Sequence, residues 1–248
     1  MDTYQSMTRN PLEHGRSEDR LHPWWWSDRY YHLTALKRQL EIIVAQYLPR
    51  KDLVLVDLGC GDMPYRPLFE PLTTQYIGVD LPGNQQADVH SSPRGETFLE
   101  SDLADVVLST QVLEHVENPG AYLRECNRIL KPGGLLIIST HGYWMYHPDP
   151  TDFWRWTSSG LSKILQAAGF KIIYWQGVMG LASTAVQLFQ DAVTRKLPGF
   201  IKVPFIIIAQ FFIMLCDKMQ PAAGRNADAC VFVSVALKQP VSSLDAEM

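Results

Sequence analysis

The stretch Val54-Leu-Val-Asp-Leu-Gly-Cys-Gly61 decides the fold, because a short apolar strand runs there into a turn that carries two glycines. Further along the chain a second apolar strand, Gln75–Val79, ends directly before Asp80. Glycines let a ligand approach the backbone closely, and a carboxylate at the end of the second strand can accept bonds from two ribose hydroxyls. The layout therefore predicts a nucleoside site at the edge of a parallel sheet.

The glycine turn departs from the dinucleotide fingerprint Gly-x-Gly-x-x-Gly. The third glycine is replaced by Pro64, which follows Met63. Proline has no N–H to donate and its φ is fixed, so it is a poor cradle for a pyrophosphate. We expect a nucleoside ligand without a diphosphate, and a nicotinamide-dependent oxidoreductase is disfavoured.

Composition limits the class of protein. The chain has 248 residues, 46% of them hydrophobic, which is enough to bury one full core. Its net charge of −4 gives no electrostatic footprint for nucleic acid. Four cysteines without paired or metal-binding spacing, and a polar N-terminus, indicate a reduced cytoplasmic protein without a secretory signal. We expect a flexible N-terminus (1–22), one domain (23–238) and a flexible tail (239–248).

Predicted strands alternate with helices along the rest of the chain. The strands are expected at 53–57, 75–79, 86–89, 104–109, 134–139, 171–175 and 230–236. Helices are expected at 119–130, at 157–168, and between a Ser27-Asp28 cap and Pro49. Apolar strands in such an alternation form a mostly parallel sheet covered on both faces, with ligands bound at the carboxyl ends of the strands.

Four motifs occur in order, at residues 57–61, 78–80, 105–115 and 130–134. Together they resemble the class I S-adenosylmethionine-dependent methyltransferases, in the group with a Leu-Glu-His loop after strand four. The resemblance covers about residues 50–180 and the last strand. Pro64-Tyr-Arg66 and residues 149–155 also resemble a bacterial subgroup associated with surface glycans. The resemblance implies a Rossmann-like, doubly wound, seven-stranded sheet with a helical insertion before the last strand.

The same resemblance assigns a cofactor site for S-adenosylmethionine. It would consist of the ribose ligand Asp80, the adenine contact Leu81, the loop residues Gly59, Cys60 and Gly61, the loop organiser Asp57, and Gln111 at the amino-acid end. Many relatives hold the adenine with an acidic residue and a Leu-Pro-Phe run, where this chain has His90-Ser-Ser-Pro-Arg-Gly-Glu-Thr-Phe98. Asp88 and His90 are the remaining candidates for that contact.

Methyl transfer requires donor and acceptor to be aligned and water to be excluded, and a hydroxyl acceptor benefits from a general base. His115, beyond strand four, and His141, after strand five, are the candidate bases, and each can also be read as a structural histidine. No metal site is expected, because nothing completes a coordination shell around His147, Asp149 and Asp152.

A second cluster, residues 147–156, follows the fifth strand. Arg155 could bind an anionic group of the acceptor, while Trp154 and Trp156 could stack on a sugar or ring. Alternatively, Asp149 and Asp152 cap turns and the aromatic side chains pack inward. Both interpretations stay open. Trp24-Trp25-Trp26 is expected to cap the core, with a place in the substrate site as the alternative.

Residues 181–226 form an apolar insertion before the last strand. One helical face carries Leu181, Ala185, Leu188, Phe189, Ala192 and Val193, opposed by Gln187, Asp191 and Arg195. The run Val203–Cys216 is almost entirely apolar, but at 14 residues it is shorter than the roughly 20 that span a bilayer. A helical lid, a membrane-surface anchor and a homodimer face through 181–218 all remain open.

The expected function is methyl transfer from S-adenosylmethionine to a small-molecule acceptor. A hydroxyl of a saccharide or lipid-linked substrate is the first acceptor class to consider, and a nucleic-acid acceptor is disfavoured. The expected location is the cytoplasm, with a peripheral position on the inner face of the membrane as a variant. The alternative is a catalytically degenerate, cofactor-binding scaffold or partner protein.

Overall fold

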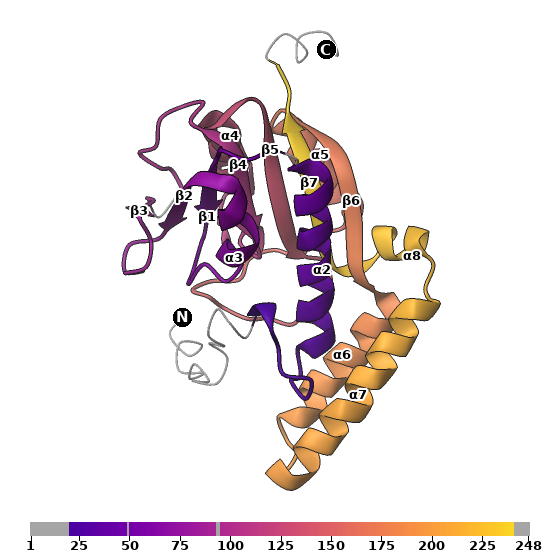
Figure 1. Ribbon diagram of the computed structural model, residues 1–248. Coiled ribbons are helices and arrows are strands. Elements are labelled where there is room, and N and C mark those ends of the chain that lie inside the picture. The colour runs from indigo at the N-terminus through magenta and orange to yellow at the C-terminus, as the bar shows by residue number, and fades with distance from the viewer. Residues whose placement is uncertain (1–19, 49, 93–94, 241–248) are drawn as a thin grey trace.

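A seven-stranded sheet forms the centre of the molecule, with strand order β3-β2-β1-β4-β5-β7-β6 (Figure 1). The computed structural model describes residues 20–48, 50–92 and 95–240. Neighbouring strands from β3 to β5 are parallel, whereas β7 is antiparallel to both β5 and β6. The predicted doubly wound, mostly parallel sheet is confirmed.

The elements follow in order along the chain. The strands are β1 Leu53–Leu58, β2 Thr73–Asp80, β3 Val89–His90, β4 Ala104–Thr110, β5 Leu130–His141, β6 Phe170–Gly180 and β7 Ala229–Lys238. The helices are α2 Tyr30–Tyr47, α3 Arg66–Phe69, α4 Pro119–Ile129, α5 Ser158–Ala167, α6 Leu181–Thr194, α7 Gly199–Met219 and α8 Ala222–Ala227. Two short 3-10 turns, η1 Glu70–Leu72 and η2 Leu113–His115, complete the described elements.

Side-chain caps explain where α4 and α5 begin. The Asn118 side chain accepts a hydrogen bond from the Ala121 N–H, and Thr157 does the same for Gly160. The predicted Ser27 cap is less direct, because Ser27 accepts from the Arg29 N–H and α2 begins at Tyr30. These local signals place the described helices within a few residues of their predicted bounds.

The third strand differs from its prediction at 86–89, because β3 has only two residues, Val89 and His90. The Asp88 carboxylate accepts a 2.8 Å bond from the Gly78 N–H, and the Asp88 N–H donates back to the Gly78 carbonyl. These contacts hold the chain across β2, so regular pairing starts only at Val79 and Val89. The predicted flexible ends lie mostly outside the described residues, which begin at 20 and end at 240.

Helices cover both faces of the sheet. On one face α2 packs with Leu36, Leu40 and Ile43, all fully buried. On the other, α4 and α5 pack against the sheet through side chains such as Leu123 and Leu161. Burial on both faces explains why the central strands are nearly continuous apolar runs.

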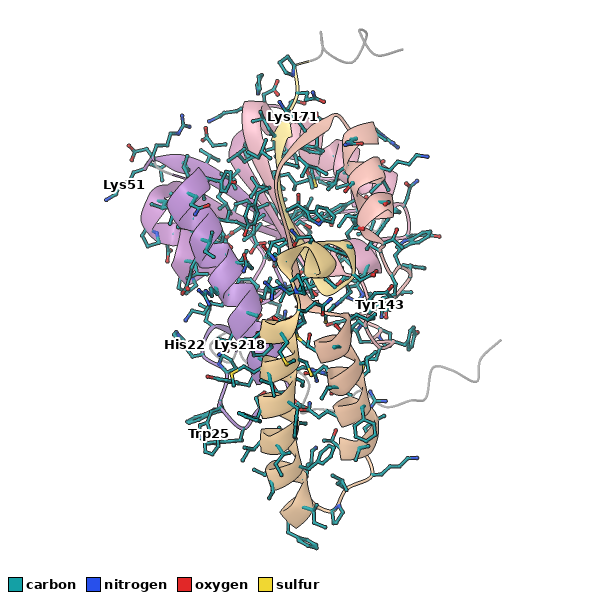
Figure 2. The ribbon with its side chains drawn as sticks, turned by 90° about the vertical axis from the view of Figure 1, so that its right-hand side faces the viewer. His22, Trp25, Lys51, Tyr143, Lys171 and Lys218 are labelled. Atoms are coloured by element: carbon teal, nitrogen blue, oxygen red, sulfur yellow. The ribbon has the colours of Figure 1, made fainter. Side chains whose placement is uncertain are left out.

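The helices α6 and α7 form a hairpin that projects beyond the carboxyl ends of the parallel strands (Figures 1 and 2). The last residue of β6, Gly180, is followed at once by the first residue of α6, Leu181. The predicted insertion is therefore helical, and it leaves the sheet at the edge where the glycine turn lies.

Candidate active site

The glycine turn after β1 is tied to the end of β2. The N–H groups of Gly59 and Cys60 both donate to the Val79 carbonyl, at 2.8 and 3.0 Å. Gly59 has a φ of +80°, and a Cβ there would lie 2.5 Å from a Val112 methyl group. Only glycine fits this position, because any side chain would be strained and would also collide with the loop after β4.

Asp80 lies beside the glycine turn, as predicted. Its carboxylate accepts bonds from the Gly61 N–H at 3.0 Å, from its neighbour Leu81 at 2.7 Å and from the Asn84 amide at 2.7 Å. Asn84, which also donates to the Gly61 carbonyl, was not predicted. The turn sequence Pro82-Gly83-Asn84 could have identified it, since asparagine in such turns bonds back to nearby groups.

The adenine candidates separate into two groups. Leu81 is 36% exposed and lies open beside Asp80. In contrast, the Asp88 carboxylate is bonded to the Gly78 N–H, and the His90 Nε2 lies 3.0 Å from the Asn84 carbonyl. Leu81 is therefore the candidate that can pack on a ring without breaking an existing contact.

Asp57 and Gln111 each bury an acceptor atom without a partner among the described residues. Asp57 is 2% exposed, and one of its oxygens accepts a 2.6 Å bond from the Tyr76 hydroxyl, while Oδ1 has none. The Gln111 amide donates to the Ser139 hydroxyl at 3.0 Å, while its Oε1 has none. Because β1 and β4 are neighbours, both orphan oxygens lie at the same sheet edge.

Two further properties distinguish these residues. Burial, with a smaller effect from the nearby Asp80 charge, raises the pKa of Asp57 to about 7. Gln111 has a φ of +56°, a conformation that costs a non-glycine residue energy and tends to persist at functional sites. A bound ammonium would supply the positive charge and the donor that these orphan oxygens lack.

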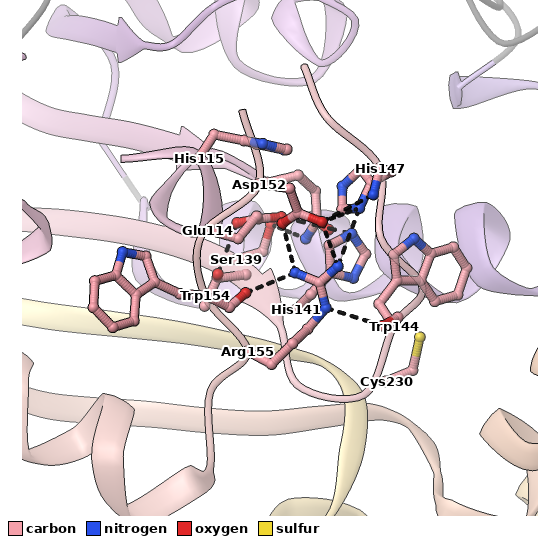
Figure 3. A network of polar contacts seen from close by, with 12 residues as sticks. Glu114, His115, Ser139, His141, Trp144, His147, Asp152, Trp154, Arg155 and Cys230 are labelled. Atoms are coloured by element: carbon pink, nitrogen blue, oxygen red, sulfur yellow. Dashed lines mark hydrogen bonds and ion pairs between the residues drawn. The ribbon is translucent and has the colours of Figure 1, made fainter. Parts of the chain in front are cut away.

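The wall beyond β4 and β5 is built on a buried carboxyl group (Figure 3). Glu114 is fully buried, with Oε2 accepting a 2.7 Å bond from the Thr140 hydroxyl. Its Oε1 lies 3.5 Å from His141 Nε2 without a hydrogen bond. Burial raises the pKa of Glu114 and lowers that of His141 well below its usual value, so both favour their neutral forms.

Four histidines gather at this wall. His32 and His141 stack on Trp144, with ring centroids 5.0 and 4.9 Å away, and His147 makes edge contacts with His115 and His141. His32 was not predicted in the site. Its position four residues before the buried Leu36, on the apolar stripe of α2, was the available signal. Burial lowers the pKa of His32 to about 3, so it packs as a neutral ring.

One ligand atom each from Glu114, His115 and His147 lies within 4.8 Å of the others, which is the spacing of a candidate cation site. The predicted grouping was different, because Asp152 instead accepts bonds from the His147 N–H and from Arg155. The expectation that no metal is used stays a prediction.

His115 and His141 differ in what they can reach. His115 Nδ1 lies 2.6 Å from the Thr151 carbonyl, which can only accept, so Nδ1 carries the proton and Nε2 keeps its lone pair. His115 is partly exposed, whereas His141 is 4% exposed. Of the two predicted bases, His115 is the more accessible.

Arg155 is committed to the chain itself. All five N–H groups of its guanidinium are used: the Asp152 carboxylate takes two, and the carbonyls of Trp144, Met145 and Trp154 take the others. The predicted anion contact would require one of these bonds to open. Asp152 therefore organises the turn, which was the alternative interpretation.

The aromatic residues of this loop do not all pack inward. Trp154 is 40% exposed and donates its Nε1 proton to the Val116 carbonyl at 2.8 Å. Trp156 Nε1 is buried without a partner among the described residues. The ring centroids of Trp154 and Trp156 lie 6.0 Å apart. Trp154 keeps an open ring face, so its predicted role in stacking on an acceptor stays a prediction.

The expected packing of the tryptophan triplet on the core is wrong. Trp24, Trp25 and Trp26 are 60%, 58% and 39% exposed. Trp24 and Trp26 stack on each other, with ring centroids 4.9 Å apart. The residues that follow, Asp28 and Arg29, contact the α6–α7 hairpin. The sequence pattern could not separate a core cap from an aromatic surface, because both are apolar.

Comparison with known proteins agrees with this geometry. Residues 25–174 match a family described as a methyltransferase domain. A ubiquinone biosynthesis O-methyltransferase of Cereibacter sphaeroides (strain ATCC 17029 / ATH 2.4.9) is 38% identical over 106 residues, 38% of this chain and 43% of that protein. The match thus spans less than half the length of that relative.

Solved structures show the same fold. An S-adenosylmethionine-dependent methyltransferase from Mesorhizobium loti has a TM-score of 0.54 at 18% identity, over 82% of this chain and 98% of that one. The Haemonchus contortus phosphoethanolamine N-methyltransferase 2, solved with S-adenosyl-L-methionine, has a TM-score of 0.52 at 14% identity, over 93% and 61%. At these identities the likeness concerns the fold alone.

Proposed function

This chain belongs to the methyltransferase domain family, and from that premise we propose that it transfers a methyl group from S-adenosylmethionine to a hydroxyl oxygen of a small acceptor. S-adenosylmethionine is the cofactor of this family, and it supplies a methyl group on a positively charged sulfur. The four cysteines of the chain are free, which supports a reducing, cytoplasmic compartment.

The observation that carries the proposal is the pair of orphan acceptor atoms, Asp57 Oδ1 and Gln111 Oε1. Buried polar atoms normally have partners, so two of them at one sheet edge indicate a missing donor. The amino-acid end of the cofactor carries that donor and a positive charge. Gly59, whose position excludes any side chain, would let the cofactor lie against the backbone, and Asp80 would receive the ribose.

His115 is the residue that we propose to hold the acceptor's proton. Its Nε2 is the free acceptor nitrogen of a ring fixed by the Thr151 carbonyl. The neighbouring wall of neutral Glu114 and His141 is buried, so it helps to exclude water from the reacting atoms. The protein's remaining task is to align donor and acceptor, which contributes much of the rate in such displacements.

A hydroxyl of a saccharide or a lipid-linked compound is the acceptor class that we propose. The exposed ring of Trp154 beside the His115 loop supports a flat or ring-shaped acceptor. The relatives named as ubiquinone biosynthesis O-methyltransferases support an oxygen acceptor. The resemblance of residues 64–66 and 149–155 to glycan-associated members supports a saccharide, through side chains other than Arg155, which is already fully bonded.

The test is transfer of radiolabelled methyl from S-adenosylmethionine into soluble and membrane-lipid extracts. Wild-type protein should label a product, and His115→Gln should lower kcat by about 100-fold or more while cofactor binding is unchanged. His22→Gln, which changes an exposed histidine that has no proposed role, is the control and should keep full turnover. Equal turnover of His115→Gln would remove the base role, and cofactor binding without labelling would indicate a scaffold.

A further inference from the structure

The α6–α7 hairpin has the opposite polarity to a helix pair of a water-soluble protein. The residues that it buries are mostly polar: Ser183, Thr184, Gln187, Gln190, Asp191, Thr194, Gln210 and Asp217. It exposes many large apolar residues: Leu181, Phe189, Phe200, Ile201, Val203, Ile208, Phe211, Phe212, Leu215 and Met219. A surface helix normally turns its apolar stripe inward, so the outer face of this hairpin is built for an apolar surrounding.

The buried polar residues fasten the hairpin to the body. The Asp28 carbonyl accepts hydrogen bonds from the amides of Gln187, Gln190 and Gln210, at 3.0, 2.9 and 2.9 Å. Arg29 pairs with the buried Asp191 at 2.7 Å. These bonds hold the hairpin against the start of α2, with its apolar face outward.

A second set of bonds secures the base of the hairpin. The Asp217 carboxylate accepts from the Gly180 N–H at 2.8 Å and from the Tyr31 hydroxyl at 2.9 Å. Because Gly180 ends β6 and Asp217 lies near the end of α7, this contact joins the hairpin to the sheet. The outward orientation is therefore specified at both the base and the middle.

The outer surface of the hairpin carries only positive charge. Arg195, Lys196 and Lys202 lie around its tip, and Lys218 lies at its base. Both acidic residues of the hairpin, Asp191 and Asp217, are buried and bonded. This distribution is complementary to the anionic head groups of a lipid leaflet.

We propose that this hairpin embeds its outer face in the surface of an anionic lipid bilayer. The exposed residues Ile201, Ile208, Leu215 and Met219 recur at intervals of seven or four along α7, so they form one continuous stripe. An amphipathic helix with such a stripe and basic flanks lies in the plane of the membrane interface. The exposed Trp24–Trp26 segment lies at the same end of the molecule, and tryptophan favours that interface (Figure 2).

A membrane-spanning position fits less well. α7 has 21 residues, longer than the expected 14-residue run, and is long and apolar enough to cross a bilayer by length and composition alone. A tip that carries Arg195, Lys196 and Lys202 would, however, have to bring three charges through the hydrocarbon, at a cost of roughly 3 kcal/mol each. With the hairpin in the interface, the same charges stay among the head groups.

Docking in this way would turn the carboxyl ends of the parallel strands toward the membrane. The hairpin leaves the sheet at the carboxyl edge, where Asp57 and Gln111 lie. The Arg195 guanidinium lies 3.2 Å from Met145 Sδ, which belongs to the loop between β5 and α5. The membrane contact rests on the hairpin alone and does not depend on the proposed methyl transfer.

The test is sedimentation of the full chain with vesicles of phosphatidylcholine plus phosphatidylglycerol, compared with phosphatidylcholine alone. Wild-type protein should bind the anionic vesicles more strongly, and Phe211→Ser should weaken the binding by about tenfold or more, because one phenyl group no longer leaves water. The matched control is Phe98→Ser, which removes an 89% exposed phenyl outside the hairpin and should change nothing.

A charge test separates the head-group contribution. Lys196→Gln with Lys202→Gln should reduce binding to anionic vesicles by about tenfold and leave binding to neutral vesicles unchanged. The control changes Lys51 and Lys171, which lie at the opposite end of the molecule (Figure 2), and should have no effect.

Two results would overturn the proposal. One is wild-type protein that stays in solution with anionic vesicles at low salt. The other is a homodimer, seen by sedimentation equilibrium, that Phe211→Ser dissociates while vesicles are not bound; the apolar face would then belong to a second copy. Loss of cofactor binding with intact vesicle binding would contradict only the proposed function.

Discussion

The sheet buries mainly apolar side chains, whereas the α6–α7 hairpin buries mainly polar ones. In the sheet, side chains such as Leu108 and Val233 are fully buried. In the hairpin, Gln187 and Gln190 are fully buried while Phe211 is 55% exposed. The sheet thus hides its apolar side chains from water, whereas the outer surface of the hairpin suits an apolar surrounding. Apolar composition alone therefore does not tell which face of a helix is buried.

Three substitutions test this contrast. Leu108→Ala in the sheet should lower the free energy of unfolding by about 2–5 kcal/mol, because it leaves a cavity. Gln210→Leu in the hairpin should lower it by about 1–3 kcal/mol, since the Tyr31 N–H and the partner glutamines lose bonds. Phe211→Gln should change it by less than about 0.5 kcal/mol. Urea denaturation without lipid measures all three.

The opposite order of the two hairpin variants in stability would show that the hairpin does not bury its polar face. If Gln210→Leu stabilised the protein and Phe211→Gln destabilised it by more than about 1 kcal/mol, the hairpin would bury its apolar face in solution. The sheet variant serves as the internal reference for a buried side chain.

The buried carboxyl Asp57 gives the sheet a pH dependence of its own. Its folded pKa of about 7 is raised above the unfolded value, so its contribution to stability is complete at low pH and is lost as pH rises through 7. Asp57→Asn stays neutral and can still accept from Tyr76. Without cofactor, the free energy of unfolding of the variant relative to that of wild type should therefore be higher at pH 8 than at pH 5, by on the order of 2–4 kcal/mol.

Denaturation curves at the two pH values, for both proteins, measure that difference. Asp105→Asn provides a contrast, because bonds from the Val54 N–H and Lys131 hold the pKa of Asp105 below its usual value, so this variant should lose stability by similar amounts at both pH values. If the wild-type and Asp57→Asn curves shift in parallel with pH, the buried-carboxylate account of the cofactor edge fails.

The sheet and the cofactor edge were predictable because their signals are local. The spacing of Asp57, Gly59 and Asp80 fixes a strand, a turn and a strand end, and the structure brings them together. Apolar strands alternating with capped helices likewise specify the doubly wound sheet. The Asp88 contact that displaces β3 was not predictable, because it depends on a side chain reaching across to Gly78.

The wall beyond β4 and β5 and the hairpin could not be predicted without tertiary information. Arg155 carries a charge that suggests a ligand, but three backbone carbonyls of its own loop compete for it. His32 comes from a helix distant in sequence, and its place beside Trp144 follows from how α2 packs. For α6, periodicity identified two faces, but the buried one was decided by the Asp28 carbonyl, which only the fold brings near.

The most direct measurement is calorimetric titration of the purified protein with S-adenosylmethionine and S-adenosylhomocysteine, with NADH as control. We expect micromolar binding of the first two and none of NADH. Asp80→Ala should weaken that binding by about 1.5–3 kcal/mol, the scale of hydrogen bonds to a charged group, and the exposed Asp228→Ala should not. No binding of either sulfur compound, or unchanged affinity in Asp80→Ala, would contradict the cofactor site described at this edge of the sheet.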